Sequence, residues 1–288
     1  MNDRDWIAVD WGTSHLRVWE MCGAQVLKVH HSDNGMGRLN PDGFAPALYG
    51  LVGDSNVPIV ACGMVGSKQG WCEAPYLQTP SAPPSIKQAA RMDNVYILPG
   101  IKHLNPPDVM RGEETQIAGF LAQNPNFNGV LCLPGTHCKW VRILDGQIVS
   151  FKTVMTGELF ALITEQSLLR HGMDNNWDGT AFHEAVFDTL SYPERLVERL
   201  FQIRANNLLN GLGSGCARAQ VSGYLIGAEL AATKSYWQAK EVVVIGATRL
   251  APCYLAALRA QRVTTRAVDG ESLVLDGLIA AKSELVNL

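Results

Sequence analysis

The sequence predicts an α/β protein built from two similar lobes. Its 288 residues are too many for one small core and suit two domains of ordinary size. Short apolar runs typical of buried strands alternate with longer segments whose apolar residues recur every three or four positions. A strand, turn, strand, turn, strand pattern near residue 10 also recurs near residue 133. The repeat predicts that similar strands open each lobe.

The two copies of the repeat keep the same spacing of turn residues. AVDWGTSHLRVWEMCGAQVLKV has the layout of VLCLPGTHCKWVRILDGQIVSF, with short apolar strands at 7–9 and 130–133. The matching residues are each separated by 123 positions: Gly12 and Gly135, Thr13 and Thr136, and Gly23 and Gly146. We expect both Gly-Thr turns to face a common cleft that accommodates a nucleoside triphosphate.

Only the first copy has an acidic residue at the end of its first strand. Asp10 precedes the turn Gly12, Thr13 and Ser14, whereas Leu133 occupies the equivalent position in the second copy. A plain hairpin explains the first copy taken alone, because these residues are ordinary turn formers. A cradle of backbone N–H groups and hydroxyls for phosphate, with a carboxylate for a divalent cation, is the alternative. The repeat favours the cradle and predicts one metal site, at Asp10.

Further strands, loops and a helix follow in the N-terminal half. Residues 58–63 and 94–98 have the apolar character of buried strands. The proline-rich segments 74–86 and 105–108 predict loops. Residues 112–123 predict a helix with two acids in its first turn, where the helix dipole favours them.

The C-terminal half is mostly helical. Helical spacing occupies 157–172, 180–208 and 223–240, and the glycine-rich 211–215 predicts a turn. A strand at 241–245 runs into the turn Gly246-Ala247-Thr248, followed by predicted helices at 249–261 and 271–282. We predict an N-terminal lobe of residues 1–110, on which 271–288 pack back, and a nucleotide-binding C-terminal lobe of residues 111–270.

Composition and charge exclude several classes of function. The net charge of −3, without a basic cluster, argues against nucleic acid or a membrane surface as partner. No apolar run reaches the roughly 18 residues of a membrane span, and the N-terminus lacks a signal-peptide pattern. Seven scattered cysteines without a CxxC pair indicate neither a disulfide framework nor a zinc site. We expect a cytoplasmic protein with small-molecule partners, and the sequence leaves a homodimer open.

The chain lacks the standard phosphate-loop and hydrolase motifs. A Gly-Lys pair, GxGxxG, HExxH and GxSxG are all absent, so phosphate binding would depend on the two hairpins. PPDVMRGEETQ at 106–116 contains three acids, more than helix capping needs, and suits a general base. Either Asp108 or Glu113 could supply that base.

Two other segments suit a small polyhydroxylated ligand. ACGMVGSKQGWCEAPY at 61–76 follows a strand and gathers polar and aromatic side chains. MTGELF at 155–160, directly after the second hairpin, is the second candidate segment. His137 and Lys139 are explained equally well as turn or core residues and as ligand contacts. Gly246 ends a strand, where the backbone can approach a purine or ribose closely.

The overall layout resembles the actin and hexokinase superfamily of ATP-dependent phosphotransferases, whose two ribonuclease H-like lobes flank an ATP cleft. Within it, the chain is similar to the family of kinases that act on 2-dehydro-3-deoxygalactonate. The resemblance rests on IAVDWGTSHLRVW, VACGMVGSKQGWCEAPY, PPDVMRGEETQIAGFL, LCLPGTHCKWV and FKTVMTGELFAL, in the first 165 residues. The C-terminal part is only broadly similar, and Cys138 stands where serine is expected.

The resemblance implies transfer of the γ-phosphoryl group of ATP to the 6-hydroxyl of 2-dehydro-3-deoxy-D-galactonate in galactonate catabolism, with Mg²⁺. It implies that Asp10 holds Mg²⁺ through water and that Asp108 is the base, with Glu113 as rival because exopolyphosphatases carry Gly-Glu-Glu at a comparable place. The implied ATP contacts are Gly12, Thr13, Ser14, Gly135, Thr136, His137 and Gly246. The implied substrate contacts are Met64, Ser67, Lys68, Gln69, Trp71, Arg111, Lys139 and Glu158.

Two choices remain open in this assignment. The substrate carboxylate needs a cation, which Lys68, Arg111 or Lys139 could provide. The activity could also be that of a kinase for another sugar or sugar acid, or the chain could be a nucleotide or sugar sensor without turnover. A pure binder needs no base, so the acids at 108–114 favour an enzyme.

Overall fold

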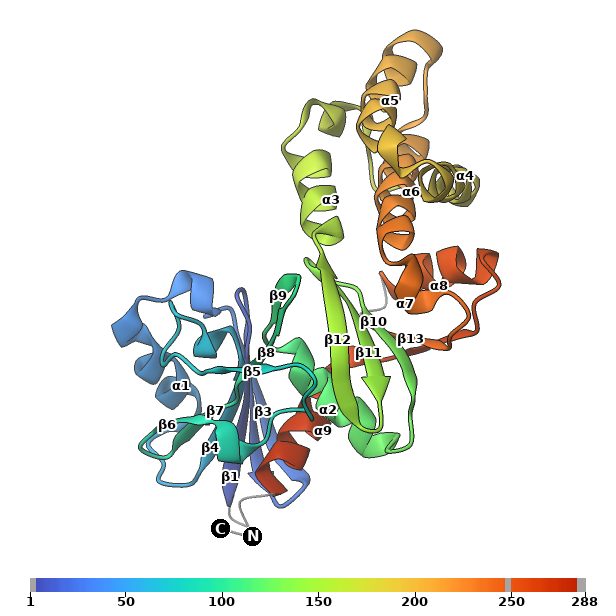
Figure 1. The fold of residues 1–288 in the computed structure, drawn as a ribbon. Coiled ribbons are helices and arrows are strands. Elements are labelled where there is room, and N and C mark those ends of the chain that lie inside the picture. The colour runs from blue at the N-terminus through green and yellow to red at the C-terminus, as the bar shows by residue number, and fades with distance from the viewer. Residues whose placement is uncertain (1–3, 247–249, 284–288) are drawn as a thin grey trace. The chain divides into compact units, whose positions relative to one another are not determined.

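The computed structural model describes residues 4–246 and 250–283, which form two compact units (Figure 1). Unit 1 contains the described residues of Met1–Asn128, Ile143–Phe151 and Gly270–Leu288. Unit 2 contains the described residues of Gly129–Arg142 and Lys152–Asp269. The helix predicted at 112–123 therefore lies in unit 1, beyond the lobe boundary that the sequence suggests at residue 110.

Unit 1 is built on a six-stranded sheet of order β3-β2-β1-β4-β7-β6. Its strands are β1 Trp6–Trp11, β2 Leu16–Cys22, β3 Gln25–Ser32, β4 Ile59–Gly63, β6 Ala90–Met92 and β7 Val95–Ile97. The first three strands pair antiparallel, whereas β4 pairs parallel with β1 and β7 pairs parallel with β4. The carboxyl ends of β1 and β4 consequently lie side by side.

Helices cover both faces of this sheet. Helix α1, Phe44–Val52, packs Phe44 and Leu48 against Ile7 and Val9 of β1. On the other face, Val274 of α9 contacts the cluster around Trp6. Helix α9 is Gly270–Ser283 and packs on α2, Glu113–Gln123. The predicted closing helix is thus confirmed, and it returns to unit 1; residues 284–288 lie outside the described residues.

A second, three-stranded sheet in unit 1 corrects the predicted loops. Its strands, in the order β5-β8-β9, are β5 Tyr76–Gln78, β8 Gly100–Leu104 and β9 Pro107–Met110. The prediction of loops throughout 74–86 and 105–108 is therefore wrong in part. Proline is tolerated at Pro107 because it begins an edge strand, where its missing N–H removes no ladder hydrogen bond.

Unit 2 contains a five-stranded sheet of order β12-β11-β10-β13-β14. Its strands are β10 Gly129–Leu133, β11 Cys138–Leu144, β12 Gln147–Val154, β13 Val242–Ile245 and β14 Thr265–Val268, and Ile143–Phe151 group with unit 1. β13 pairs parallel with β10, as β4 does with β1. The repeat is confirmed, because both sheets place their first three strands consecutively and then add parallel strands. The turn glycines Gly23 and Gly146 are both left-handed, with φ of 57° and 72°.

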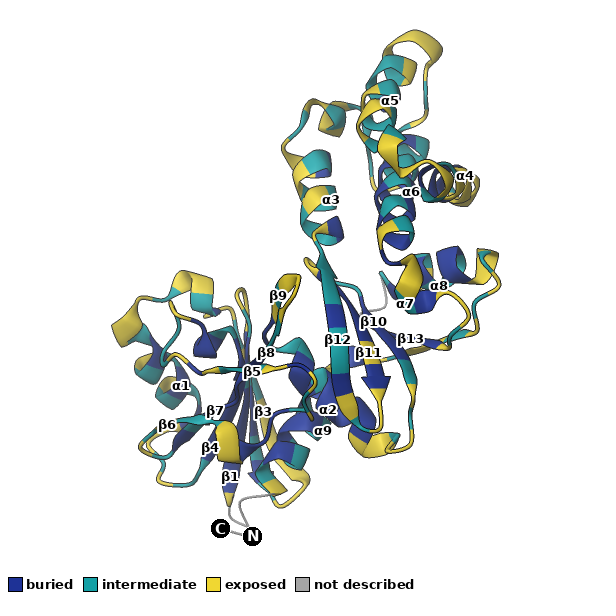
Figure 2. Ribbon diagram, viewed as in Figure 1, coloured by how far each residue is buried: buried dark blue, intermediate teal, exposed yellow. Residues whose placement is uncertain are grey.

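The helices of unit 2 pack around α6 (Figure 1). They are α3 Thr156–Glu165, α4 Gly179–Ser191, α5 Leu196–Asn210, α6 Ser214–Ala232, α7 Lys234–Trp237 and α8 Ala251–Ala260. A β-carbon at Gly223 would lie 2.5 Å from the carbonyl oxygen of Phe182, so α4 and α6 touch through their backbones. Helix α6 is mostly buried, while α5 is largely exposed (Figure 2). The helical character predicted for this half is confirmed.

Three short 3₁₀ segments are relevant to the site: η1 Met36–Arg38, η3 Met64–Gly66 and η5 Leu168–Gly172. Among residues 4–246 and 250–283, no helix combines the length and apolar character that a membrane span requires.

Candidate active site

Asp10 lies at the carboxyl end of β1, where Arg17 of β2 binds its side chain. The two residues are paired in the β1–β2 register. Arg17 donates from Nε and Nη2 to Oδ2 of Asp10 at 3.0 and 2.6 Å. Burial opposes the charge of Arg17, but the Asp10 carboxylate outweighs this and raises the pKa of the guanidinium. Among the described residues, Oδ1 of Asp10 receives only a long contact from the thiol of Cys62, at 3.8 Å, and keeps lone pairs available.

The turn after Asp10 is fixed by backbone contacts with residues 35–37. Gly37 N donates to the carbonyl of Thr13 at 2.9 Å, and Met36 N donates to that of Gly12 at 3.0 Å. A β-carbon at Gly35 would lie 2.2 Å from the carbonyl carbon of Ser14, so only glycine fits there. The side chains of Thr13 and Ser14 remain exposed. The turn therefore combines a fixed backbone with two hydroxyls that are accessible to an anion.

The N-terminus of α2 lies beside the end of β4, next to Asp10. A β-carbon at Gly63 would be 3.5 Å from Oδ1 of Asp10, and one at Gly112 would be 3.6 Å from Cα of Gly63. Glu113 begins α2 and accepts a hydrogen bond from the N–H of Arg111 at 3.2 Å. The Gly63–Gly112 approach thus brings the start of α2 close to the carboxyl ends of β4 and β1.

Asp108 lies apart from this arrangement, in edge strand β9 of the three-stranded sheet. Its Oδ1 accepts the N–H of Val109 at 2.8 Å, and the residue faces His103 across the β8–β9 ladder. The two candidate bases therefore belong to different elements of unit 1, Asp108 to strand β9 and Glu113 to helix α2.

Glu114 is fully buried at the start of α2 and accepts the N–H of Gly112 with both oxygens, at 2.8 Å each. Burial, assisted by the neighbouring charge of Glu113, raises the pKa of Glu114 to about 8. The side chain is accordingly protonated at neutral pH. A protonated Glu114 places no like charge beside Glu113.

The raised pKa of Glu114 predicts a specific pH dependence of stability. The unfolded chain releases this proton near the ordinary pKa of 4.5, whereas the folded chain holds it to about 8. Stability contributed by the protonated form is therefore lost as pH rises from about 5 to about 8. We expect Glu114→Gln to flatten the dependence of the melting temperature on pH, measured by circular dichroism. The exposed substitution Glu165→Gln serves as the control, and equal slopes for wild type and Glu114→Gln would refute the assignment.

The segment after β4 presents two exposed polar side chains and a packed aromatic anchor. Lys68 and Gln69 are exposed, and Met64 in η3 is half-buried. Trp71 stacks on Phe44 with a centroid distance of 6.3 Å and an interplanar angle of 9°. Trp71 therefore secures the segment on the core, while the residues before it remain available to a ligand.

The side chain of Arg111 makes most of its contacts with other residues of unit 1. Its Nη2 donates to the carbonyl of Ala74 at 2.8 Å, and its guanidinium lies 4.2 Å above the ring of Tyr76. Arg111 Nη1 and Ser67 Oγ are buried, without a hydrogen-bond partner in the part of the chain that the structure describes. Arg111 consequently fixes the 74–76 segment beside β8.

The second Gly-Thr turn lies against the N-terminus of α3 in unit 2. Glu158 N donates to the carbonyl of Thr136 at 2.9 Å. A β-carbon at Gly157 would lie 2.1 Å from the carbonyl oxygen of Gly135. His137 Nε2 and Glu158 Oε2 are 2.6 Å apart, so these predicted ligand residues also pair with each other. Turn amides and a helix N-terminus together favour an anion.

Lys139 and Gly246 contact the residues of this turn and the residue before it. Lys139 is buried, and its Nζ donates to the carbonyl of His137 at 3.1 Å. Gly246 follows β13, and a β-carbon there would lie 3.4 Å from Cδ of Pro134. The other residues of the predicted turn after β13, and the predicted start of the next helix, are 247–249 and lie outside the described residues.

A cavity of about 720 Å³ adjoins the second turn within unit 2. This volume lies in the range of small-ligand pockets. Residues from the turn, α3, α6, α8 and the loop before α4 line it, among them Thr136, Phe160, Trp177, Arg218 and Tyr254. No local pattern marks Trp177 or Arg218 as site residues, because both resemble ordinary surface residues. Arg218 lies 5.1 Å from the ring of Phe160.

A buried carboxylate supports the wall of this cavity. Glu229 of α6 accepts hydrogen bonds from Trp140 Nε1 and Tyr254 Oη, each at 2.7 Å. Burial raises the pKa of Glu229, while hydrogen bonds from Thr156, Trp140 and Tyr254 oppose that shift. Cys138, at the position where serine is expected, forms a hydrogen bond with Tyr254 Oη at 2.8 Å. The thiol therefore takes part in the same cluster.

The donor set suits a metal held mainly by water and phosphate. No group of three or more His, Cys, Asp or Glu side chains is placed to hold a metal within residues 4–246 and 250–283. Mg²⁺ commonly binds proteins through one or two carboxylates and keeps several waters. Asp10, with its free Oδ1 lone pairs, fits that pattern.

A family model and two relatives that are similar to this chain share one description. A family model described as 2-keto-3-deoxy-galactonokinase matches residues 10–281. A probable 2-dehydro-3-deoxygalactonokinase of Rhizobium meliloti (strain 1021) is 40% identical over 291 residues, 95% of this chain and 95% of the relative. The 2-dehydro-3-deoxygalactonokinase of Escherichia coli (strain K12) is 36% identical over 293 residues, 98% of this chain and 99% of the relative.

A solved structure extends this similarity to three dimensions. The crystal structure of a Sinorhizobium meliloti protein assigned as a 2-dehydro-3-deoxygalactonokinase matches with a TM-score of 0.92 at 37% identity. The match covers 98% of this chain and 100% of that one. The similarity therefore includes the mostly helical C-terminal half.

Proposed function

The chain belongs to the 2-keto-3-deoxy-galactonokinase family, and on that basis we propose that it phosphorylates the 6-hydroxyl of 2-dehydro-3-deoxy-D-galactonate with ATP, in galactonate catabolism. The observation that carries this proposal is the match of the family model to residues 10–281, which include both Gly-Thr turns and the acids of α2. Phosphoryl transfer needs little covalent chemistry from a protein, so positioning and charge neutralisation are the main requirements.

Asp10 and the first turn would position the metal and phosphate groups. Arg17 holds Oδ2 of Asp10, so Oδ1 would face a water-coordinated Mg²⁺. The ion, when bound, would neutralise charge on the transferred phosphoryl group. The exposed hydroxyls of Thr13 and Ser14 would donate hydrogen bonds to phosphate oxygens.

Glu113 is the base that the geometry favours over Asp108. A base must reach the attacking hydroxyl near the metal, and the Gly63–Gly112 approach brings the start of α2 beside Asp10. Asp108 is instead part of edge strand β9. Protonated Glu114 places no like charge beside Glu113, which supports Glu113 as acceptor of the hydroxyl proton.

Unit 2 would bind the nucleotide. The turn Gly135 to His137 and the α3 N-terminus would contact phosphate, and the adjoining cavity has aromatic and cationic groups that suit a purine and ribose. Glu229 would keep Thr156 and Tyr254 in place at the cavity wall.

Lys68 is the cation that we propose for the substrate carboxylate. Arg111 already donates to Ala74 and stacks on Tyr76, and Lys139 donates to the carbonyl of His137. Lys68 is the exposed member of the three and lies two residues after η3, which follows β4. A lysine there can move to a carboxylate without breaking an internal contact that the structure records for it.

A substrate panel tests the proposed activity. We expect ADP release with Mg²⁺, ATP and 2-dehydro-3-deoxy-D-galactonate, with a phosphate monoester on carbon 6 detected by phosphorus NMR. The gluconate-derived epimer and a neutral hexose are the comparison substrates, and omission of Mg²⁺ is the control. Faster turnover of the hexose would indicate another sugar kinase. Nucleotide binding without ADP release on any substrate would indicate a sensor.

A further inference from the structure

Helix α5 exposes a row of large apolar side chains to solvent. Val197, Phe201 and Leu208 are 79%, 71% and 64% exposed. Spacings of four and seven residues place these side chains on one face of the helix. We refer to Val197, Phe201 and Leu208 as the α5 stripe. Figure 2 shows α5 as mainly exposed, in contrast to the buried α6.

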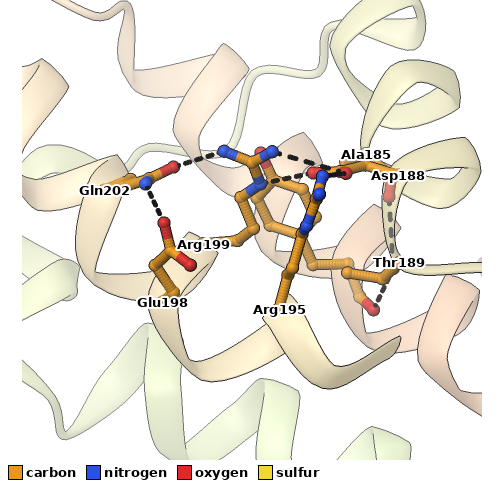
Figure 3. Close-up of polar contacts among 8 residues, drawn as sticks. Ala185, Asp188, Thr189, Arg195, Glu198, Arg199 and Gln202 are labelled. Carbon is orange, nitrogen blue, oxygen red and sulfur yellow. Dashed lines mark hydrogen bonds and ion pairs between the residues drawn. The ribbon is translucent and has the colours of Figure 1, made fainter. Parts of the chain in front are cut away.

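Contacts on the other side of α5 fix the direction in which the stripe faces. Arg199 forms an ion pair with Asp188 of α4 and donates to Gln202 Oε1 at 2.7 Å (Figure 3). Gln202 in turn donates to Glu198 at 2.7 Å. Ile203 is buried in a cluster with residues of α6. The stripe is therefore held outward by the contacts that attach α5 to α4 and α6.

Opposite charges lie symmetrically about Phe201, the middle residue of the stripe. Glu198 precedes Phe201 by three residues, and Arg204 follows it by three. The structure records no ion-pair partner for Arg204 among residues 4–246 and 250–283. Glu198 accepts a hydrogen bond from Gln202 but uses only Oε1 for it. An acid and a base thus lie equally far on either side of one aromatic residue.

We propose that the α5 stripe binds a second copy of this chain, with the two α5 helices antiparallel and Phe201 at the two-fold axis. In an antiparallel pair centred on Phe201, Glu198 faces Arg204 of the partner subunit, and symmetry forms this ion pair twice. Val197 then faces Ala205 of the partner subunit, a small residue that leaves room for it. Phe201 and Val197 would form an apolar centre beside these ion pairs, as protein interfaces generally do. Leu208, seven residues from the axis, would lie beyond the paired part of the two helices.

The charge pattern favours a second copy over other occupants. A two-fold interface must be complementary to itself, and the acid and base placed symmetrically about Phe201 meet that condition. A membrane-surface helix would instead be rich in Lys and Arg on its polar face. The α5 helix is about 22 Å long by its rise per residue, enough for a central helix pair.

Charge reversal on either side of Phe201 tests the proposal in the full-length protein. We expect sedimentation equilibrium to give a dimer for wild type, and a dissociation constant at least about tenfold weaker for Phe201→Glu, Glu198→Arg or Arg204→Glu. The double variant Glu198→Arg with Arg204→Glu restores opposite charges and should recover the wild-type constant. Phe187→Glu on α4 is the matched control, because Phe187 is similarly exposed, at 67%, and lies off α5.

Three results would overturn the proposal: a monomeric wild type at every concentration, a dimer unaffected by Phe201→Glu, or a double variant as weak as the single ones. Melting curves by circular dichroism check that each variant folds. The proposal is independent of the proposed function, because association is measured without substrate or nucleotide.

Discussion

Replacing Asp10 with Asn abolishes phosphoryl transfer and leaves the fold intact: we expect kcat to fall by about 10³-fold or more. The substitution keeps the shape of the side chain but removes the negative charge that would attract Mg²⁺. It also replaces the charged pair with Arg17, whose Nη2 lies 2.6 Å from Oδ2, by a neutral hydrogen bond. Asp10 is half-buried at a strand end. Because Asn and Asp have nearly the same volume, the packing around this position does not change.

The measurement combines ADP release at saturating substrate with a melting curve. Asp33→Asn is the control, since Asp33 is 76% exposed and its partner is His15, at 3.3 Å. We expect wild-type turnover for the control. An Asp10→Asn variant with wild-type kcat would eliminate Asp10 as metal anchor, whereas a large fall in melting temperature would show that the Arg17 pair has a mainly structural role.

Glu113→Gln has the second largest expected effect, a loss of about 10²- to 10⁴-fold in kcat, the usual contribution of a positioned general base. An amide cannot accept the proton of the attacking hydroxyl, although it retains the size of the glutamate. Its backbone partner, the N–H of Arg111 at 3.2 Å, can still donate to the amide oxygen.

Asp108→Asn is the matched comparison for Glu113→Gln. Because Asp108 lies in edge strand β9, we expect its amide variant to keep kcat within about threefold of wild type. The test is kcat for both variants at saturating substrate. Loss of turnover in Asp108→Asn alone would restore Asp108 as the base.

Local patterns were sufficient to predict the hairpins and most helices. Gly12 and Gly135 could be recognised from the sequence because each turn needs its own turn-forming residues, whatever surrounds it. Strand β9 was missed because the adjacent Pro106 and Pro107 predicted a loop. Pro107 is tolerated because β9 pairs only with β8 and lies at the edge of its sheet, which the sequence alone does not reveal. The pairing of Arg17 with Asp10 depends on the β1–β2 register, which two alternating strands could have indicated.

Short segments of the chain were enough to predict the α/β class, the repeated hairpins and the candidate residues, because turn chemistry and hydrophobic period are local properties. Which elements come together follows from packing between distant segments. The approach of Gly112 to Gly63 placed the start of α2 next to the end of β4, and burial gave Glu114 its raised pKa. Packing against α4 and α6 also left Phe201 in solvent. These outcomes depend on neighbours distant in sequence, which no local pattern specifies.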